Sequence, residues 1–284
     1  MIAGRPMPTR TIARVALMVL ALLAGTAARA WAVTVSPTAL FIDARNPTGT
    51  LVLFNGGSLP EEIEVSFAFG YPQTDAAGKM HTVLADSAPA GEPSIVPYAR
   101  AFPRRLTLAP GQRQTLRVLV QAPAGMAEGE YWGRVVVRAR GGQPPIEQTQ
   151  GDVRVQLNVE TATATAVLYR KGAVQTGLSV AGTTARLVGS AVQADFDVAR
   201  TGNAVYLGHV RAEVVTADGR VVGQVEDAMA VYRALRLHYE IPLAAGAPRT
   251  GLTVRYTFDT DRPDLPATGP LKAAATSGTA PVQG

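Results

Sequence analysis

The sequence predicts an all-β fold in which two immunoglobulin-like antiparallel β-sandwich domains follow a cleaved signal peptide. Three observations predict it: apolar and polar residues alternate along several stretches, turn-forming residues separate these stretches, and the N-terminal segment has the pattern of an export signal. The 284 residues are enough for about two domains. With 47% hydrophobic and 17% charged residues the chain is too apolar to be disordered, and its 28 glycines and 20 prolines argue against long helices. It has no cysteine, which excludes disulfide scaffolds, structural zinc fingers and thiol catalysis.

Residues 1–32 form the predicted signal peptide. They carry four arginines and no acidic residue, the apolar run Val15–Gly25 follows the first three of these arginines, and small residues suit cleavage after Ala30 or Ala32. The apolar run is shorter than the ~20 residues that span a membrane. Without the four arginines the chain has 23 basic and 22 acidic residues, so we expect no nucleic-acid partner and no stable membrane insertion.

The first predicted domain covers residues 33–171. Apolar side chains alternate with others in residues 62–69, 115–121 and 153–160, as expected of strands that bury one face. Turn-forming residues lie between such stretches, at residues 55–57, 109–111 and 141–145. The interval Arg140–Gln150 is predicted to be a mobile loop between two long strands. The strands recur without a helical stretch between them, which favours a β-sandwich.

The second predicted domain covers residues 172–262 and begins where a long strand ends, near Tyr169–Gly172. Its predicted strands are residues 191–200, 206–216, 220–225, 235–243 and 252–258. Asp218-Gly219 predicts a tight hairpin turn between two of them. The tail, residues 263–284, is rich in Pro, Ala, Thr and Gly, and we expect it to be disordered.

Three segments of the first domain carry a resemblance to a known family. They are Pro103–Gln112 with the following strand Gln114–Val118, the acidic and aromatic run Glu128–Trp132, and the end of a strand at Val167–Arg170. In their order and spacing they resemble the periplasmic chaperones of the chaperone–usher pilus assembly family, of which this chain would be a divergent member. The specific matches cover about residues 95–171.

The resemblance implies a function without catalysis and without a cofactor. Such a chaperone works in the periplasm and lends its seventh strand to a pilus or other secreted surface subunit that lacks a strand of its own, before an outer-membrane usher takes the subunit over. Here the seventh strand corresponds to residues 152–169, and the side chains expected to enter the subunit are Val153, Val155, Leu157 and Val159. The alternative is that these side chains face the core of their own domain.

Two further sets of residues take predicted roles from the resemblance. Glu128 and Arg170 match the positions of an ion pair at the domain junction, a structural role. Family members hold the C-terminal carboxylate of the subunit with cations in the first and seventh strands, but this chain has no Arg or Lys between Trp31 and Asp43, and Ala166 takes the second position. Either Arg45 or Lys171 makes the contact instead, or the protein is a paralogue that does not assemble pili.

The remaining residues offer little chemistry. His81, His209 and His238 form no metal-binding motif, and His238 with Glu240 would supply two ligands where a site needs at least three. The motifs of serine nucleophiles are absent, and the acidic pairs Glu61–Glu62 and Asp259/Asp261 have nothing that marks them as catalytic. We therefore predict no metal site and no enzyme. The alternative to a chaperone is an exported structural or adhesive immunoglobulin-like protein.

Overall fold

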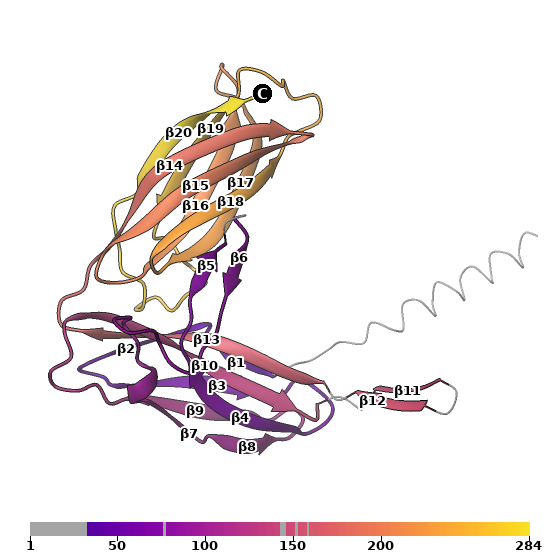
Figure 1. Ribbon diagram of the computed structural model, residues 1–284, viewed down its shortest axis with the longest axis vertical. Coiled ribbons are helices and arrows are strands. Elements are labelled where there is room, and N and C mark those ends of the chain that lie inside the picture. Colours follow the sequence, from indigo (N-terminus) through magenta and orange to yellow (C-terminus); the bar gives the residue numbers. More distant parts are fainter. Residues whose placement is uncertain (1–32, 76–77, 143–145, 151–152, 158) are drawn as a thin grey trace, which may run out of the picture.

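The computed structural model describes residues 33–75, 78–142, 146–150, 153–157 and 159–284; the predicted signal peptide, residues 1–32, lies outside the described residues. The described part consists of β-strands and one short 3-10 helix, η1 (Val96–Tyr98). Figure 1 shows two bodies joined at an angle, the lower one holding the earlier strands and the upper one the strands from β14 onward. The prediction of an all-β fold with two sandwich domains is confirmed for the residues described.

The lower body is a sandwich of two sheets. One sheet has the strand order β1 (Thr34–Ser36), β3 (Thr48–Phe54), β9 (Arg113–Val120), β7 (Ala99–Phe102). The other has the order β2 (Ala39–Asp43), β13 (Glu160–Lys171), β10 (Gly129–Arg140), β4 (Glu61–Ala68), β8 (Arg105–Leu108). The alternation of the sequence predicts β4 and β9 correctly, because Ile63 and Val65 of β4 and Leu116 and Val118 of β9 are buried between the sheets.

The turn after β3 shows how one polar side chain can fix a chain reversal. Asn55 is fully buried, and its amide nitrogen donates hydrogen bonds to the carbonyl oxygens of Leu59, at 2.8 Å, and Leu108, at 2.9 Å. Its side-chain oxygen accepts a hydrogen bond from the Gly57 N–H at 2.8 Å. A buried amide is tolerated because its donors and its acceptor are all paired.

The upper body is a second sandwich, with its core between two sets of strands. One set has the order β14 (Thr176–Val188), β15 (Ala191–Gly202), β18 (Ala234–Pro242). The other has the order β17 (Val221–Val231), β16 (Tyr206–Val215), β19 (Thr253–Asp259), β20 (Thr276–Gln283). Parallel pairing of β20 with β14 joins the two sets. In the core, the Phe196 ring meets those of Tyr256 and Phe258 edge-on, with centroids 5.0 and 5.5 Å apart.

The prediction of a disordered tail at residues 263–284 is wrong. Residues Thr276–Gln283 form β20, which pairs antiparallel with β19 from Thr276↔Phe258 to Pro281↔Thr253. Ala280 alone of this strand is buried, so the sequence carries no row of apolar residues to mark it. The strand is held mainly through its backbone, and Gly278 lies where any side chain would meet the Tyr256 ring.

Two hairpins project from the lower body. Between β4 and η1 the chain forms β5 (Pro72–Thr74) and β6 (Met80–Thr82), which pair with each other. Beyond β10 it forms β11 (Ile146–Gln150) and β12 (Val153–Leu157), also a pair, so residues predicted as a loop include a strand. The single strand predicted for residues 152–169 is therefore divided: β12 ends at Leu157 and β13 begins at Glu160.

Candidate functional site

The candidate site is the margin of β13 that faces away from β10. On the β10 side, β13 is paired along its whole length, from Glu160↔Arg140 to Lys171↔Gly129. On the other side, β2 pairs with it in parallel only from Ala166↔Ala39 to Arg170↔Asp43. Within the described chain, residues 160–165 of β13 thus have a partner on one margin only, and we call the other one the free margin.

The path of the chain before β2 explains why the free margin exists. Residues Thr34–Ser36 form β1, which pairs with β3 in the opposite sheet. The chain then crosses to the sheet that contains β13 and enters it as β2 at Ala39. Because the residues before Ala39 belong to the other sheet, they cannot pair with residues 160–165 of β13.

Side chains along the free margin are small. Thr161, Thr163 and Thr165 are cross-strand neighbours of core residues of β10, and Thr165 is buried. Ala162 and Ala164 lie on the opposite face and are exposed. This half of β13 therefore offers main-chain groups along its margin, with little apolar bulk beside them.

The predicted donor residues lie next to the free margin and beyond it. Val159 directly precedes β13 and is 45% exposed. Val153, Val155 and Leu157 belong to β12, whose partner is β11, and their side chains lie outside the described part of the structure. Figure 1 shows the β11–β12 hairpin projecting beyond the ends of β10 and β13. Whether these four side chains enter a partner stays a prediction.

The predicted ion pair at the domain junction involves a different glutamate. The Arg170 Nε donates a hydrogen bond to Glu130 Oε2 at 2.6 Å, and the other oxygen of Glu130 accepts one from the Val205 N–H of the upper body at 2.9 Å. Glu128 is exposed, and its carboxylate accepts a hydrogen bond from the Ala173 N–H at 3.4 Å. The assignment of Glu128 is therefore wrong.

The register of the strands explains why Arg170 pairs with Glu130 and not with Glu128. Glu130 is the cross-strand neighbour of Arg170, whereas Glu128 precedes β10. Burial raises the pKa of the Glu130 carboxyl, while the Arg170 guanidinium and the Val205 N–H act in the opposite direction by stabilising its ionised form. The sequence contained the signal, because the acidic and aromatic run offers two glutamates and only the pairing of the strands distinguishes them.

The two cations predicted to hold a carboxylate lie at the far end of β13. Lys171 is its last residue, and its ammonium donates to the carbonyl oxygens of Pro123 at 3.2 Å and Ala124 at 2.5 Å. Arg45 lies in the exposed turn after β2, where its N–H donates to Asp43 Oδ1 at 2.8 Å. Lys171 lies eleven residues after Glu160 along the extended strand, a distance of roughly 35 Å. Their role in binding a carboxylate remains a prediction.

Aromatic residues fill the junction between the two bodies, and no sequence pattern predicted that they meet. Phe69, Trp132, Leu168, Val205 and Tyr232 form one buried cluster drawn from both bodies. The Trp132 ring meets that of Tyr232 edge-on, with centroids 5.2 Å apart. This cluster and the Glu130 carboxylate hold the lower body against the upper body. They do so at the end of β13 that pairs with β2.

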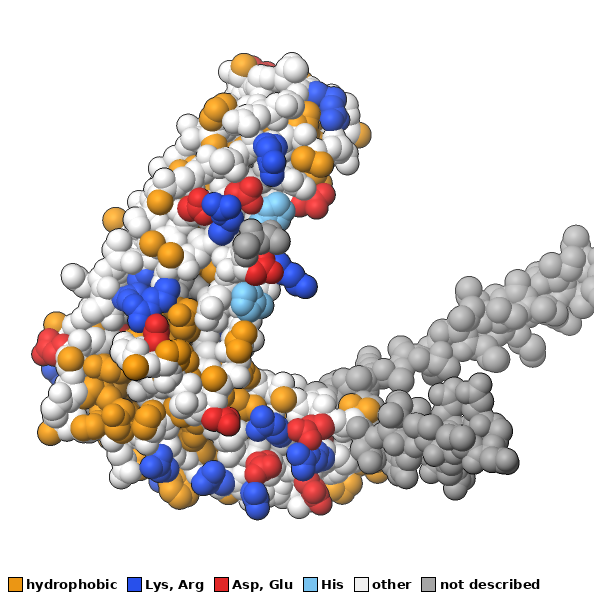
Figure 2. All heavy atoms as spheres, in the orientation of Figure 1, with side chains coloured by type: hydrophobic (Ala, Val, Ile, Leu, Met, Phe, Trp, Pro, Cys, Tyr) orange, Lys and Arg blue, Asp and Glu red, His pale blue; other side chains and the backbone are white. Residues whose placement is uncertain are grey.

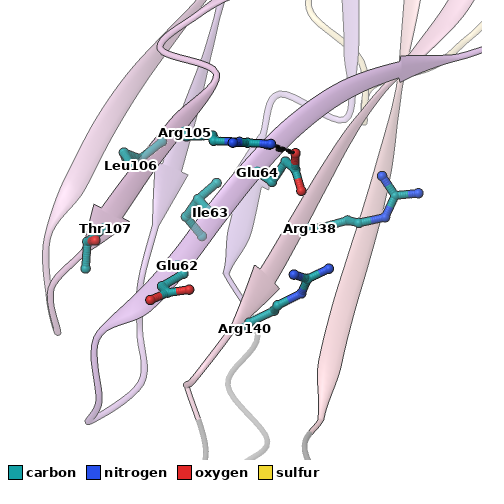
Figure 3. A pocket seen from close by; sticks show the side chains of 8 residues that line it. All are labelled: Glu62, Ile63, Glu64, Arg105, Leu106, Thr107, Arg138 and Arg140. Atoms are coloured by element: carbon teal, nitrogen blue, oxygen red, sulfur yellow. Dashed lines mark hydrogen bonds and ion pairs between the residues drawn. The ribbon is translucent and has the colours of Figure 1, made fainter.

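A polar hollow of about 570 Å³ lies on the outer face of the same sheet, near the start of β13. Figure 3 shows that β4, β8 and β10 supply its side chains. Arg105 pairs with Glu64 at 2.9 Å, and Arg140 pairs with Glu160 of β13 at 2.5 Å. The Arg105 guanidinium lowers the pKa of the Glu64 carboxyl through its hydrogen bond and its charge. These charges largely neutralise one another, so we assign the hollow no chemistry.

The described residues contain no group of three or more His, Cys, Asp or Glu side chains that could hold a metal ion. His238 and Glu240 share the exposed face of β18, as predicted, and Asp195 Oδ1 lies 2.7 Å from His238 Nδ1. No helix in the described chain is long and apolar enough to cross a membrane.

No protein-family model matches the sequence, and no curated protein matches it. Solved structures do show similarity. The YadV chaperone has a TM-score of 0.46 and 13% identity, over 87% of this chain and 98% of that chain. A structure of the Salmonella enterica SafA pilin in complex with the SafB chaperone has a TM-score of 0.43 and 15% identity, over 89% of this chain and 98% of that chain. The E. coli chaperone DraB has a TM-score of 0.40 and 13% identity, over 80% of this chain and 90% of that chain. All three names include a chaperone.

Proposed function

We propose that this protein is a periplasmic chaperone that caps pilus or other secreted surface subunits by adding β13 to them as an edge strand. The observation that carries the proposal is the free margin at residues 160–165 of β13. An exposed strand margin pairs readily with another chain, which makes it a hazard unless it has a use. Addition of a strand supplies main-chain hydrogen bonds, and the alternating side chains supply specificity.

The added strand would offer the subunit its backbone at residues 160–165, where Thr161, Thr163 and Thr165 lie beside core residues of their own sandwich. Val159 and the residues of β12 before it would supply the larger apolar side chains. Each Val or Leu that becomes buried in the subunit would contribute about 1.5–3 kcal/mol. The subunit needs no nucleotide or metal for this exchange, and the chaperone needs no catalytic residue. Transfer to an outer-membrane usher would complete the cycle.

One observation favours the alternative, an exported structural or adhesive protein. Lys171, one of the two cations available to hold the carboxylate of a subunit, donates to carbonyl oxygens of its own chain. A carboxylate that is buried without a cation is costly. A subunit held by β13 would therefore depend on strand pairing more than on its C-terminal charge.

The test is co-expression with a subunit-like protein encoded beside this one. We expect a one-to-one complex in the periplasmic fraction. Val159→Asp should abolish recovery of the subunit, because a carboxylate would enter an apolar groove. Val188→Asp is the matched control, since Val188 is 48% exposed on β14 of the upper body. Equal recovery with both variants, while both remain folded by circular dichroism, would overturn the proposal in favour of the alternative.

A further inference from the structure

The hairpin β5–β6 is the core of a longer arm that leaves the lower body after β4. We define the arm as residues 69–75 and 78–85. Its base is closed by two hydrogen bonds between the ends, from the Phe69 N–H to the Ala85 carbonyl at 2.7 Å and from the Ala85 N–H to the Phe69 carbonyl at 2.9 Å. Gly70 lets the two sides approach, because a Cβ there would lie 2.6 Å from the Val83 carbonyl oxygen.

One side of the arm is fastened to the upper body. The Tyr71 ring stacks on that of Tyr232, with centroids 5.5 Å apart. Farther out, Thr74 Oγ1 of β5 accepts a hydrogen bond from the Arg236 N–H of β18 at 3.0 Å. Near the tip, a Cβ at Gly78 would lie 3.9 Å from the Cβ of His238. Contacts at the base, the middle and the tip make the arm a fixed surface instead of a loose loop.

Three apolar side chains in the returning segment of the arm, residues 80–84, are exposed. Met80, Val83 and Leu84 are 51%, 61% and 42% exposed. The four other large apolar side chains of the described chain with such exposure, Phe102, Val159, Val188 and Val221, lie far apart in the sequence. Single exposed apolar residues need no explanation, but three of them within residues 80–84 of a rigid element are typical of an interaction surface. We call these three residues the arm patch.

The position of the arm limits which partner can reach the patch. Figure 1 shows β13 above β10 in the lower body, so the free margin faces the side on which the upper body and the arm stand. Figure 2 shows the molecule hollowed on this side. A domain that adds its strands to the free margin would extend the sheet into this hollow. β6 is the outer strand of the arm, because β5 makes the contact with β18.

We propose that the arm patch is a second contact surface for the subunit that β13 caps. This inference rests on the proposed function, which supplies the subunit. The patch packs against apolar surface of the subunit beside the groove that receives β13, and the fastening of the arm to β18 fixes the place of that contact before the subunit arrives. Affinity is gained this way because little freedom of the arm is lost on binding.

The test measures subunit affinity for the full chain with Met80→Ser and Val83→Ser combined. Leu84 is left unchanged because its Cδ2 packs over Gly70. We expect about tenfold weaker binding by titration calorimetry with the purified subunit, as for loss of a moderate interface contact. The matched control combines Val188→Ser and Val221→Ser, two exposed valines of the upper body, and should leave the affinity within about twofold.

Three results separate the possibilities. If the subunit does not bind the unaltered protein, the proposed function itself is wrong. A subunit that binds both double variants as tightly as the unaltered protein overturns the arm patch alone and leaves the capping by β13 standing. If the patch variant instead only converts a dimer of the free chaperone to a monomer, the patch serves a second copy of this chain and the inference is wrong. A photo-crosslinking residue at position 83 should capture the subunit in the co-expressed complex.

Discussion

The two halves of β13 have the same partner on one margin and different surroundings on the other. From Ala166 to Arg170 the strand lies between β10 and β2, and Val167 and Leu168 are fully buried. From Glu160 to Thr165 it pairs, among the strands that the structure describes, with β10 alone, and its side chains are threonines and alanines after the first residue. One strand thus serves as a structural element at one end and as an open edge at the other.

The difference teaches how a protein can keep an open edge without aggregating. A long apolar edge invites pairing with any other chain, and natural proteins limit this with short or charged edges. Here the open half carries small side chains, and Glu160 at its start pairs with Arg140 at 2.5 Å. The larger apolar side chains of the region are confined to the closed half and to the segment before Glu160. Strand addition then requires a partner that also fits this second segment.

The largest expected effect comes from the closed half, at the junction. Glu130→Ala leaves the Arg170 guanidinium and the Val205 N–H without their acceptor in a buried place. Loss of one partner of a buried ion pair costs about 3–5 kcal/mol of unfolding free energy. Urea denaturation followed by circular dichroism measures the loss.

The control for the junction is Glu128→Ala. Glu128 is exposed, so its replacement should change the free energy of unfolding by no more than about 0.5 kcal/mol. Equal losses for the two variants would contradict the assignment of the junction pair to Glu130 and restore the one expected from the sequence.

A smaller effect compares two valines on either side of the open half. Val167→Ala removes two methyl groups from a fully buried side chain and should cost about 2 kcal/mol. Val159→Ala changes a side chain that is 45% exposed and should cost less than about 0.5 kcal/mol. Urea denaturation of both variants gives the comparison. A loss of similar size at Val159 would mean that this residue packs in the core of its own domain, the alternative that the sequence left open.

The smallest effect concerns Glu61, at the end of the sheet where the open half lies. Its side chain is buried beside Gly142, and Oε1 has no hydrogen-bond partner within the part of the chain that the structure describes. Burial raises the pKa of the Glu61 carboxyl above its ordinary value. A carboxyl whose pKa is raised in the folded state stabilises the fold at low pH, and this stability is lost as the pH rises through the folded-state pKa.

Glu61→Gln removes the charge but keeps the shape of the side chain. We expect it to increase the free energy of unfolding at pH 7 by about 1 kcal/mol and to have no such effect at pH 3, where the carboxyl of the unaltered protein is protonated. Urea denaturation at the two pH values measures the difference, and Glu62→Gln, on the exposed side of β4, is the control. A gain that is the same at both pH values would contradict the assignment to a buried charge.

Most of the fold could be predicted from the sequence because its signals are local. Alternation identified β4 and β9, and the predicted turn at Asp218-Gly219 is present, with Gly219 at φ +83° and a hydrogen bond from the Thr216 N–H to the Arg220 carbonyl at 3.0 Å. β20 was missed because its side chains are small or polar and its stability comes from pairing with a strand already in place. The arm was missed for a similar reason, since β5 and β6 are short and gain their order from the upper body.

The candidate site could be predicted only in part. Residues near β13 were identified from their motifs, but the boundary between its closed and open halves depends on where β2 begins, 120 or more residues earlier in the chain. Glu130 could be chosen over Glu128 only from the register with Arg170. The aromatic cluster joins Phe69, Trp132 and Tyr232, which lie far apart in the sequence. No local sequence pattern predicts contacts between residues so widely separated.

The place of β20 has a consequence for the order in which the molecule matures. The ribosome delivers the chain from its N-terminus, so all strands of the lower sandwich are available once Lys171 has emerged. The upper sandwich, in contrast, lacks the strand that joins its two sets until residues 276–283 have been synthesised. As the chain emerges with its N-terminus first, the lower body can close while its neighbour is still incomplete, and truncated chains would carry a finished lower sandwich beside an unfinished upper one.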